Sequence, residues 1–266
     1  MKHIVTLTTD FGIKDHYVGV MKGVMLSINP DILIVDITHQ IPPQDIFSGA
    51  FTIRNFYRYF PQGTIHVAVI DPGVGSRRKP IALEADGYIF VGPDNGIFTF
   101  VCCESKSVKV FEISNPKYVL PNVSHTFHGR DIFAPTAARI SLGASLEDLG
   151  ERVKKTVRIT IKEPEIRSGE IIGVFIYVDS FGNLISNIPA KLIKPKSRIY
   201  IGKRIIKGVS KFYAGVQEGE LLAIAGSSGF LEISANQGRA SDVIGNTAKT
   251  SMRLKDMPQI RVKPGR

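Results

Sequence analysis

Short apolar runs and helical repeats alternate along the first part of the chain. Residues 3–9, 32–37 and 64–70 are apolar, β-rich and bounded by polar turns, which is typical of buried strands. Apolar residues recur at spacings of three and four after Asp15 and again after Asp45, which we expect to open helices. This order of strand, helix, strand, helix and strand predicts a mostly parallel sheet with helices on its faces.

The pattern changes after Leu149. Before that point, residues 81–84 and 88–91 predict two more strands and residues 130–142 predict a helix, whereas residues 151–170 are charged and predict a linker. Beyond the linker, short β-rich runs and turn signals follow one another without a convincing helix, at residues 171–178, 198–201, 221–225 and 230–234. We therefore expect an α/β protein with an N-terminal, mostly parallel α/β sandwich domain (1–158) and a smaller C-terminal antiparallel β-barrel domain (159–266).

Composition and charge narrow the class of protein. The 266 residues are 43% hydrophobic, and no stretch approaches the roughly 18 apolar residues of a membrane span. Without a signal-peptide pattern, we expect a cytoplasmic protein that binds no membrane.

The net charge is +10, but the basic residues are scattered apart from Lys154–Lys155 and a C-terminal tail that we expect to be frayed. No nucleic-acid-binding motif accompanies them, so we expect no nucleic-acid partner. The adjacent Cys102 and Cys103 are expected to be core residues.

Four clusters of polar residues stand at predicted turns. They are residues 8–12, Asp71 with Arg78, residues 126–131 and residues 179–183. Asp71 ends a buried strand and the turn returns Arg78 towards the same end, which is where open α/β sheets bind ligands. Each cluster alone is ambiguous, because Asp10 and Asp71 could cap turns and a lone His128 is more often structural. No third ligand accompanies His125 and His128, so we expect no metal site.

In this order, the clusters resemble a known family. The matching motifs are T-T-D-F-G around Asp10, D-P-G-V-G-S-R-R from Asp71, V-G-P-D-N-G from Val91, T-F-H-G-R-D from Thr126, D-S-F-G-N from Asp179 and S-S-G-F-L-E-I-S-A-N-Q-G from Ser227. The sequence is similar to the S-adenosyl-L-methionine (SAM) hydrolases that form adenosine, also called SAM hydroxide adenosyltransferases. These are relatives of the fluorinating and chlorinating SAM enzymes, and the resemblance spans nearly the whole chain.

The resemblance implies hydrolysis of SAM to adenosine and L-methionine, without a cofactor or a metal, in a homotrimer with intersubunit active sites. Its catalytic residues match Asp71, Arg78 and His128. A sulfonium is a good leaving group, so the difficulty lies in supplying hydroxide for in-line attack on the ribose 5′ carbon. Arg78 would stabilise the developing hydroxide, while Asp71 or His128 would accept its proton. The substrate-binding residues implied are Asp10 at the ribose, Phe11 beside it, Phe181 and Asn183 near the adenine, and Asp179, Ser227, Ser228 and Glu232 towards the methionine.

Departures from the halogenases favour water over halide. Asp71 stands where the halogenases carry a tyrosine, and Gly129 falls on their halide-binding position. A SAM-dependent halogenase nevertheless stays an alternative, as does a module that binds SAM or adenosine without turnover. A nucleic-acid binder, suggested only by the net charge, ranks last.

Overall fold

The computed structural model describes residues 3–245 and 256–265. The chain forms two compact units, the N-terminal unit Met1–Ile159 and the C-terminal unit Thr160–Arg266. The N-terminal unit comprises β1 (Ile4–Thr9), α1 (Tyr17–Ile28), β2 (Leu33–Thr38), α2 (Ile46–Phe56), β3 (Ile65–Val69), β4 (Pro80–Ala85), β5 (Tyr88–Pro93), α3 (Thr99–Glu104), β6 (Val108–Glu112), a π-helical turn (Gly129–Phe133) and α4 (Ala134–Ser141). No helix in the described part of the chain is long and apolar enough to cross a membrane.

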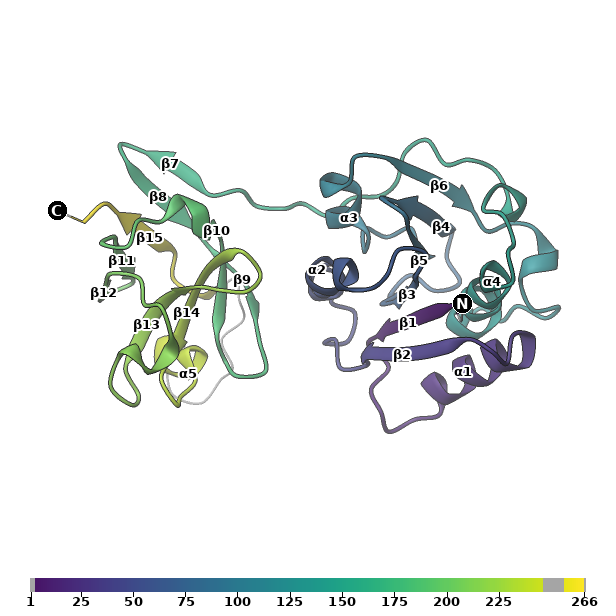
Figure 1. Cartoon of the computed structure of the whole chain (residues 1–266), viewed down its shortest axis with the longest axis horizontal. Coiled ribbons are helices and arrows are strands. Elements are labelled where there is room, and N and C mark those ends of the chain that lie inside the picture. The colour runs from purple at the N-terminus through teal and green to yellow at the C-terminus, as the bar shows by residue number, and fades with distance from the viewer. Residues whose placement is uncertain (1–2, 246–255, 266) are drawn as a thin grey trace. The chain divides into compact units, whose positions relative to one another are not determined.

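A six-stranded sheet with the order β2-β1-β3-β5-β4-β6 forms the centre of the N-terminal unit (Figure 1). Strands β2, β1, β3 and β5 run parallel, and β4 and β6 add antiparallel partners on the β5 side. In the register of β1 and β3, Thr9 lies opposite Val69. The segments that follow these two residues therefore leave the sheet at the same end, where the parallel strands finish. Asp10 and Asp71 lie at this end, which we call the carboxyl edge of the sheet.

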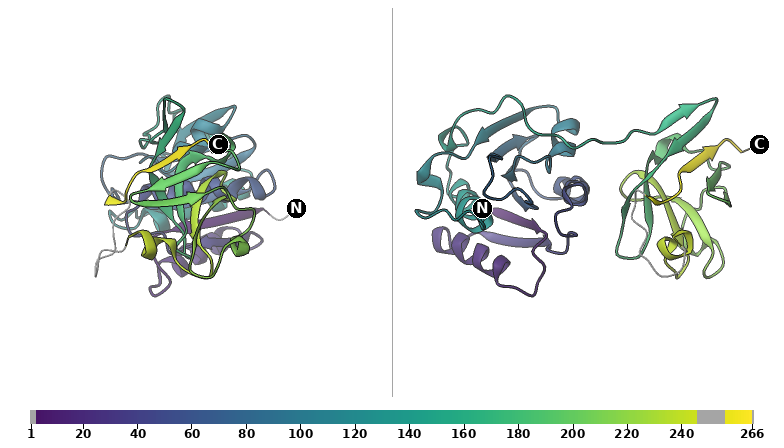
Figure 2. Two further views of the ribbon diagram at one scale, coloured as in Figure 1. Left: turned by 90° about the vertical axis from the view of Figure 1, so that its left-hand side faces the viewer. Right: turned by 180° about the vertical axis from the view of Figure 1, so that it is seen from behind.

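Helices cover both faces of this sheet, which confirms the mixed α/β class. Helices α1 and α4 pack on one face, where Met21 and Met25 contact the buried side chains of β1 and β3. Helices α2 and α3 pack on the other face, around Tyr57 and Phe90. The same layers are seen from behind in the right-hand view of Figure 2. Each Å² of buried apolar area contributes roughly 25 cal/mol, so these two layers stabilise the sheet that carries the candidate residues.

Two local predictions for this unit fare differently. Asp45 is the N-cap of α2, as expected, since its carboxylate accepts from Ser48 N (3.0 Å) and Ser48 Oγ (2.6 Å). Helix α1 instead begins after His16, two residues beyond the expected start, and no side chain caps it. The prediction that residues 32–37 form a buried strand is wrong: β2 is the edge of the sheet, where one side has no strand to cover it, and Leu33 is 49% exposed.

The C-terminal unit is built from antiparallel strands. They are β7 (Glu165–Arg167), β8 (Glu170–Gly173), β9 (Phe175–Val178), β10 (Leu184–Pro189), β11 (Arg198–Ile201), β12 (Arg204–Lys207), β13 (Leu221–Ala225), β14 (Phe230–Ala235) and β15 (Ile260–Lys263), with the short helix α5 (Ala240–Ile244). They form one sheet in the order β13-β14-β10-β9 and another in the order β12-β11-β15-β8-β7. The expected barrel is not confirmed, because neither sheet closes on itself within the described residues.

Two predictions outside the sheets' centres are wrong. The C-terminal tail was expected to fray, but in its described part Ile260 and Val262 are buried and β15 pairs with β11 and β8. Arg253, Lys255 and Arg266 of that tail lie outside the described residues. This strand has only two inward-facing apolar residues, too few to stand out among the charges. Cys103 was expected in the core but is exposed, because helix α3 turns it away from the sheet, whereas Cys102 is half-buried. Both cysteines are free.

Candidate functional site

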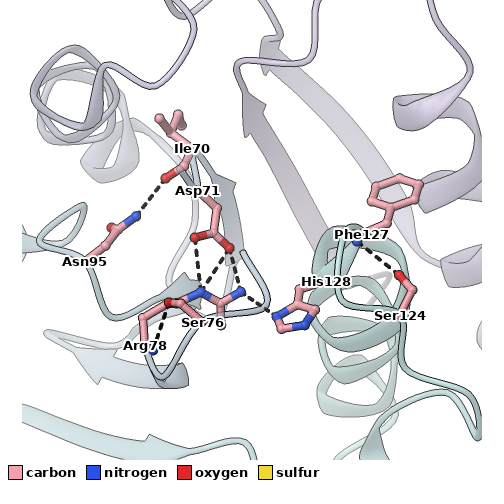
Figure 3. Close-up of polar contacts among 8 residues, drawn as sticks. All are labelled: Ile70, Asp71, Ser76, Arg78, Asn95, Ser124, Phe127 and His128. Carbon is pink, nitrogen blue, oxygen red and sulfur yellow. Dashed lines mark hydrogen bonds and ion pairs between the residues drawn. The ribbon is translucent and has the colours of Figure 1, made fainter. Parts of the chain in front are cut away.

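Three side chains distant in sequence meet beyond the carboxyl end of β3. Arg78 Nε donates to both oxygens of Asp71 (3.1 and 3.0 Å), and Arg78 Nη2 donates to Asp71 Oδ2 (2.5 Å) (Figure 3). The same Nη2 lies 2.5 Å from Nδ1 of His128. The side chains of Arg78 and Asp71 are 8% and 4% exposed. One guanidinium thus joins a carboxylate and an imidazole in a largely buried site.

The loops that carry these residues are fixed by backbone contacts. Asp71 O accepts from Val74 N (3.2 Å), which begins the tight turn that returns the chain to Arg78. Asn95 Nδ2 donates to Ile70 O (2.8 Å) and so holds the residue before Asp71. Gly75 has φ +74°, and a Cβ there would lie 2.2 Å from the carbonyl oxygen of His125. Only glycine allows this close approach of the Asp71–Arg78 loop to the segment before His128.

Arg78 determines the protonation state of His128. A guanidinium can only donate hydrogen bonds, so Nδ1 of His128 accepts and Nε2 carries the proton. Burial, and then the neighbouring positive charge of Arg78, lowers the pKa of His128 below its ordinary value of 6.5. His128 is therefore neutral at pH 7, and its one ring lone pair is already engaged by Arg78.

Arg78 also has one donor to spare. Among the described residues, its Nη1 is buried and has no hydrogen-bond partner. The guanidinium carbon lies 5.4 Å from the ring centre of Phe133, a fully buried residue of the π-helical turn. A buried N–H without a partner costs about 1–3 kcal/mol, so this group is poised to bind an oxygen atom brought to the site.

Asp131 anchors the segment before the π-helical turn. Its carboxylate is completely buried and accepts from Ser124 N (2.8 Å) and from Arg130 Nε (2.5 Å). Burial raises the pKa of Asp131, but the hydrogen bonds from Arg130 and Ser124 outweigh it and hold the pKa below its ordinary value. Ser124 Oγ in turn accepts from Phe127 N (3.0 Å), next to His128 (Figure 3). These bonds fix the backbone from which His128 projects.

Asp10 lies at the same sheet edge, after β1. Its Oδ2 accepts from Gln44 N (2.8 Å), and burial is the main reason why its pKa is raised. The charge of Asp71 raises it further, which reflects the proximity of the two carboxylates. The neighbouring Phe11 ring packs against Tyr17 (5.7 Å between ring centres) and Phe127 (5.9 Å). The structure therefore brings Asp10 and Phe11 to the edge that carries Asp71.

The C-terminal unit holds the other predicted residues. Asp179 organises its own loop, since Oδ1 accepts from Asn183 N and Oδ2 from Asn183 Nδ2, both at 2.8 Å. Gly182 has φ +82°, so the loop turns sharply there and leaves Phe181 74% exposed. An aromatic ring and an amide thus stand side by side on a rigid loop.

A cavity of about 530 Å³ opens over this loop. It is lined in part by Phe181, Asn183, Tyr213, Gln237 and Arg239. The hydroxyl of Tyr213 donates to Glu232 Oε1 (2.9 Å), and burial followed by this bond raises the pKa of Tyr213 to about 12. Glu232 itself is buried and also accepts from Ser234 Oγ (2.8 Å). Glu232 therefore acts on the cavity through Tyr213.

Ser227 and Ser228 lie in the turn between β13 and β14. Neither lines the cavity beside Asn183. Conversely, the sequence did not single out Tyr213, Arg239 or Phe133, and it marked Asn95 only as part of the V-G-P-D-N-G motif. Their contacts with Glu232, Ser180, Arg78 and Ile70 join residues distant in sequence, so only the fold could reveal them.

The geometry is suited to reactions at oxygen rather than to metal-centred or nucleophilic side-chain chemistry. A buried guanidinium with a spare donor can stabilise a developing oxyanion, and the adjacent carboxylate can accept a proton. The N-terminal unit is an α/β domain with a charged cluster at the carboxyl ends of its parallel strands. This is the arrangement of α/β enzymes, which bind their ligands at that end of the sheet.

Comparison with known proteins identifies the family. Residues 5–150 match the SAM hydroxide adenosyltransferase N-terminal domain and residues 173–253 match the corresponding C-terminal domain. The chain belongs to the SAM hydroxide adenosyltransferase family, which confirms the resemblance found in the motifs.

Its relatives include enzymes of two kinds. It is 35% identical to an (R)-S-adenosyl-L-methionine hydrolase of Salinispora tropica, over 94% of this chain and 97% of the relative. It is 31% identical to a fluorinase of Nocardia brasiliensis, over 70% of this chain and 71% of the relative. The crystal structure of an uncharacterized conserved protein from Thermotoga maritima is similar with a TM-score of 0.88 and 36% identity, covering 98% of this chain and all of that one.

Proposed function

We propose that the protein hydrolyses SAM to adenosine and L-methionine. The observation that carries the proposal is the buried cluster of Asp71, Arg78 and His128, in which Arg78 retains a donor without a partner among the described residues. Family membership and the hydrolase relatives support it. Since those relatives are named for the (R) form of SAM, we propose the same preference here.

In the proposed reaction, a water molecule bound to Arg78 Nη1 attacks the ribose 5′ carbon. A C–O bond forms, the C–S bond breaks, and its electron pair goes to the sulfur, which becomes the neutral thioether of methionine. The water loses one proton to form the 5′-hydroxyl of adenosine. We propose Asp71 as the acceptor, because the lone pair of His128 is engaged by Arg78. His128 then keeps Arg78 in position.

Substrate binding is proposed to use the remaining predicted residues. We propose that Asp10 accepts hydrogen bonds from the ribose hydroxyls. The exposed ring of Phe181 and the amide of Asn183 are suited to stack on and hydrogen-bond a purine. We propose that Asp179, Ser227, Ser228 and Glu232 act on the methionine end, together with Phe11 beside Asp10. We also propose two domains, residues 1–158 and 159–266, the second a β-barrel-like domain, and a homotrimer with intersubunit sites.

Isotope labelling tests this reaction directly. The purified full chain is incubated with SAM in H₂¹⁸O, without added halide, and the products are separated by chromatography and weighed by mass spectrometry. Adenosine and methionine are expected in equal amounts, with one ¹⁸O in the 5′-hydroxyl of adenosine. The Arg78→Ala variant is the control for contaminating activity. Absence of products, or unlabelled adenosine, would contradict the proposal.

A SAM-dependent halogenase is the second candidate, favoured by the fluorinase relatives. It predicts a halogenated nucleoside when chloride or fluoride is added to the same assay. The carboxylate of Asp71 argues against it, because a negative charge beside the reacting carbon repels a halide ion. We expect adenosine to stay the only nucleoside product at any halide concentration.

A further inference from the structure

A second cavity, of about 390 Å³, lies in the N-terminal unit. It is bordered by Cys102 of α3, by strand β6 and by the chain that follows Glu151. Four basic residues, Arg152, Lys154, Lys155 and Arg158, line it together with Thr156. None of its lining residues belongs to the Asp71–Arg78–His128 cluster. Its volume falls within the roughly 300–1,000 Å³ of small-molecule sites.

The basic segment is held in place by its backbone. Val153 N donates to Val110 O of β6 (2.8 Å), which ties the segment to the sheet. Further along, Val157 N donates to Oδ1 of the buried Asp94 (2.9 Å), and Ile159 N donates to Thr99 Oγ1 (3.0 Å). The segment is therefore ordered before any ligand binds, which lowers the entropic cost of binding.

The positive charge at this cavity is not neutralised by the protein. Within residues 3–245 and 256–265, none of its four basic residues forms an ion pair, and no carboxylate lines the cavity. Arg152 helps to lower the pKa of Glu147, after the hydrogen bond from Ser145, but does not pair with it. Arg158 Nη1 donates to the sulfur of Cys103 (3.5 Å).

Two carboxylates on the bordering elements are engaged elsewhere. Glu104, at the end of α3, pairs with Arg54 (2.6 Å) and Arg58 (3.1 Å). Glu112, at the end of β6, pairs with Lys79 (2.5 Å). The four basic residues are exposed and none of them forms an ion pair among the described residues, so a bound anion would relieve their mutual repulsion.

We propose that this cavity binds a small anion with two or more phosphate groups, either inorganic pyrophosphate or the diphosphate of a nucleotide. Arginine and lysine form short, charge-assisted hydrogen bonds with phosphate oxygens, and the Thr156 hydroxyl adds a neutral donor. A single monoanion would leave most of the charge uncompensated. The cavity's volume of about 390 Å³ suits a small ligand, whereas a nucleic-acid chain would make contacts along a longer surface.

Calorimetric titration of the full chain with sodium pyrophosphate tests the proposal. At a constant ionic strength of about 0.15 M, where distant surface charges are screened, we expect one saturable site per chain. The double variant Lys154→Gln/Arg158→Gln should raise Kd by at least about tenfold, because two charge-assisted contacts are lost. The control Lys191→Gln/Lys203→Gln removes the same net charge from exposed positions of the C-terminal unit and should leave Kd unchanged.

Titration with ADP separates the two ligand sources. ADP binding more tightly than pyrophosphate assigns the site to nucleotides, and the reverse assigns it to inorganic pyrophosphate. The proposal is overturned if neither compound saturates a site, or if the cavity variant and the control bind equally well while both unfold cooperatively like the original protein. It is also overturned if an oligoribonucleotide binds at these residues and the two small anions do not.

Discussion

Replacing Gly75 by alanine should reduce activity far more than it reduces stability. The new Cβ would lie 2.2 Å from the carbonyl oxygen of His125, whereas such contacts are essentially never below 3.0 Å. The Asp71–Arg78 loop must therefore move by at least about 0.8 Å relative to the segment that carries His128. Both sides of this contact lead directly to residues of the cluster.

The consequence for the cluster follows from its distances. The bond between Arg78 Nη2 and His128 Nδ1 measures 2.5 Å, so the displacement would stretch it to about 3.3 Å, beyond the usual length of such a bond. A misplacement of about 1 Å in a catalytic site costs on the order of a hundredfold in rate, or about 2.7 kcal/mol of transition-state stabilisation. The positive φ of Gly75 adds about 1–2 kcal/mol of backbone strain in alanine.

Gly63→Ala is the matched control. Gly63 also has a positive φ, +83°, but open space surrounds the position of its Cβ, so this variant carries the strain without the collision. Adenosine formation from SAM gives kcat/KM, and urea unfolding gives the free energy of unfolding. We expect Gly63→Ala to lose about 1–2 kcal/mol of stability and Gly75→Ala to lose more because of the collision, and only Gly75→Ala to lose about a hundredfold in kcat/KM. Equal activity in the two variants would refute the argument.

Three further predictions concern single groups. Arg78→Lys should lower kcat/KM about 10²–10³-fold, because an ammonium lacks the planar guanidinium that joins Asp71 to His128. The control Arg77→Lys, at an exposed position, should leave kcat/KM unchanged. Protonated His128 cannot accept from Arg78, and burial lowers its pKa, so kcat/KM should fall only below pH 6.5. Burial also lowers the pKa of His66 to about 3 in the folded protein. Below pH 6.5 the unfolded chain takes up a proton at His66 that the folded protein does not. The free energy of unfolding should therefore fall by about 2 kcal/mol by pH 5.

The measurements that would contradict these expectations are simple. If Arg78→Lys kept the full kcat/KM, as Arg77→Lys should, the positive charge alone and not the planar guanidinium would matter near Asp71. An acidic limb of the pH–rate profile above pH 6.5 would contradict the environment described for His128. For His66, urea unfolding of the His66→Leu variant should show a weaker dependence on pH between 6.5 and 5 than the original protein does. Parallel curves would assign that dependence to other groups.

The sequence predicted the sheet and the charged cluster for a physical reason. Strand β3 is buried on both faces, so its apolar run is continuous and Asp71 marks its end clearly. The edge strand β2 has a similar composition, and composition alone could not distinguish an edge from a centre. Strand β15 escaped prediction because its partners, β11 and β8, are distant in sequence and supply the burial that its own residues do not indicate.

The site was predicted less completely than the fold. Motifs identified Asp71, Arg78 and His128 as candidates, and the fold brings them within hydrogen-bond distance. No pattern could indicate that Arg78, rather than Asp71, contacts His128, because that depends on the close approach of Gly75 to His125. The hydrogen bond from Tyr213 to Glu232 likewise depends on packing, because the two residues are nineteen positions apart and only Glu232 lies on a strand.

The π-helical turn at Gly129–Phe133 places His128 out of phase with the helix that follows. Ala134 N bonds to Gly129 O, five residues back, so this turn contains one residue more than an α-helical turn would. Each residue of an α-helix corresponds to about 100° of rotation. Deleting one residue here would give a more regular helix while turning His128 away from Arg78. A regular α-helix at this point would therefore break the contact between His128 and Arg78. The chain keeps that contact, and one helical hydrogen bond spans five residues instead of four.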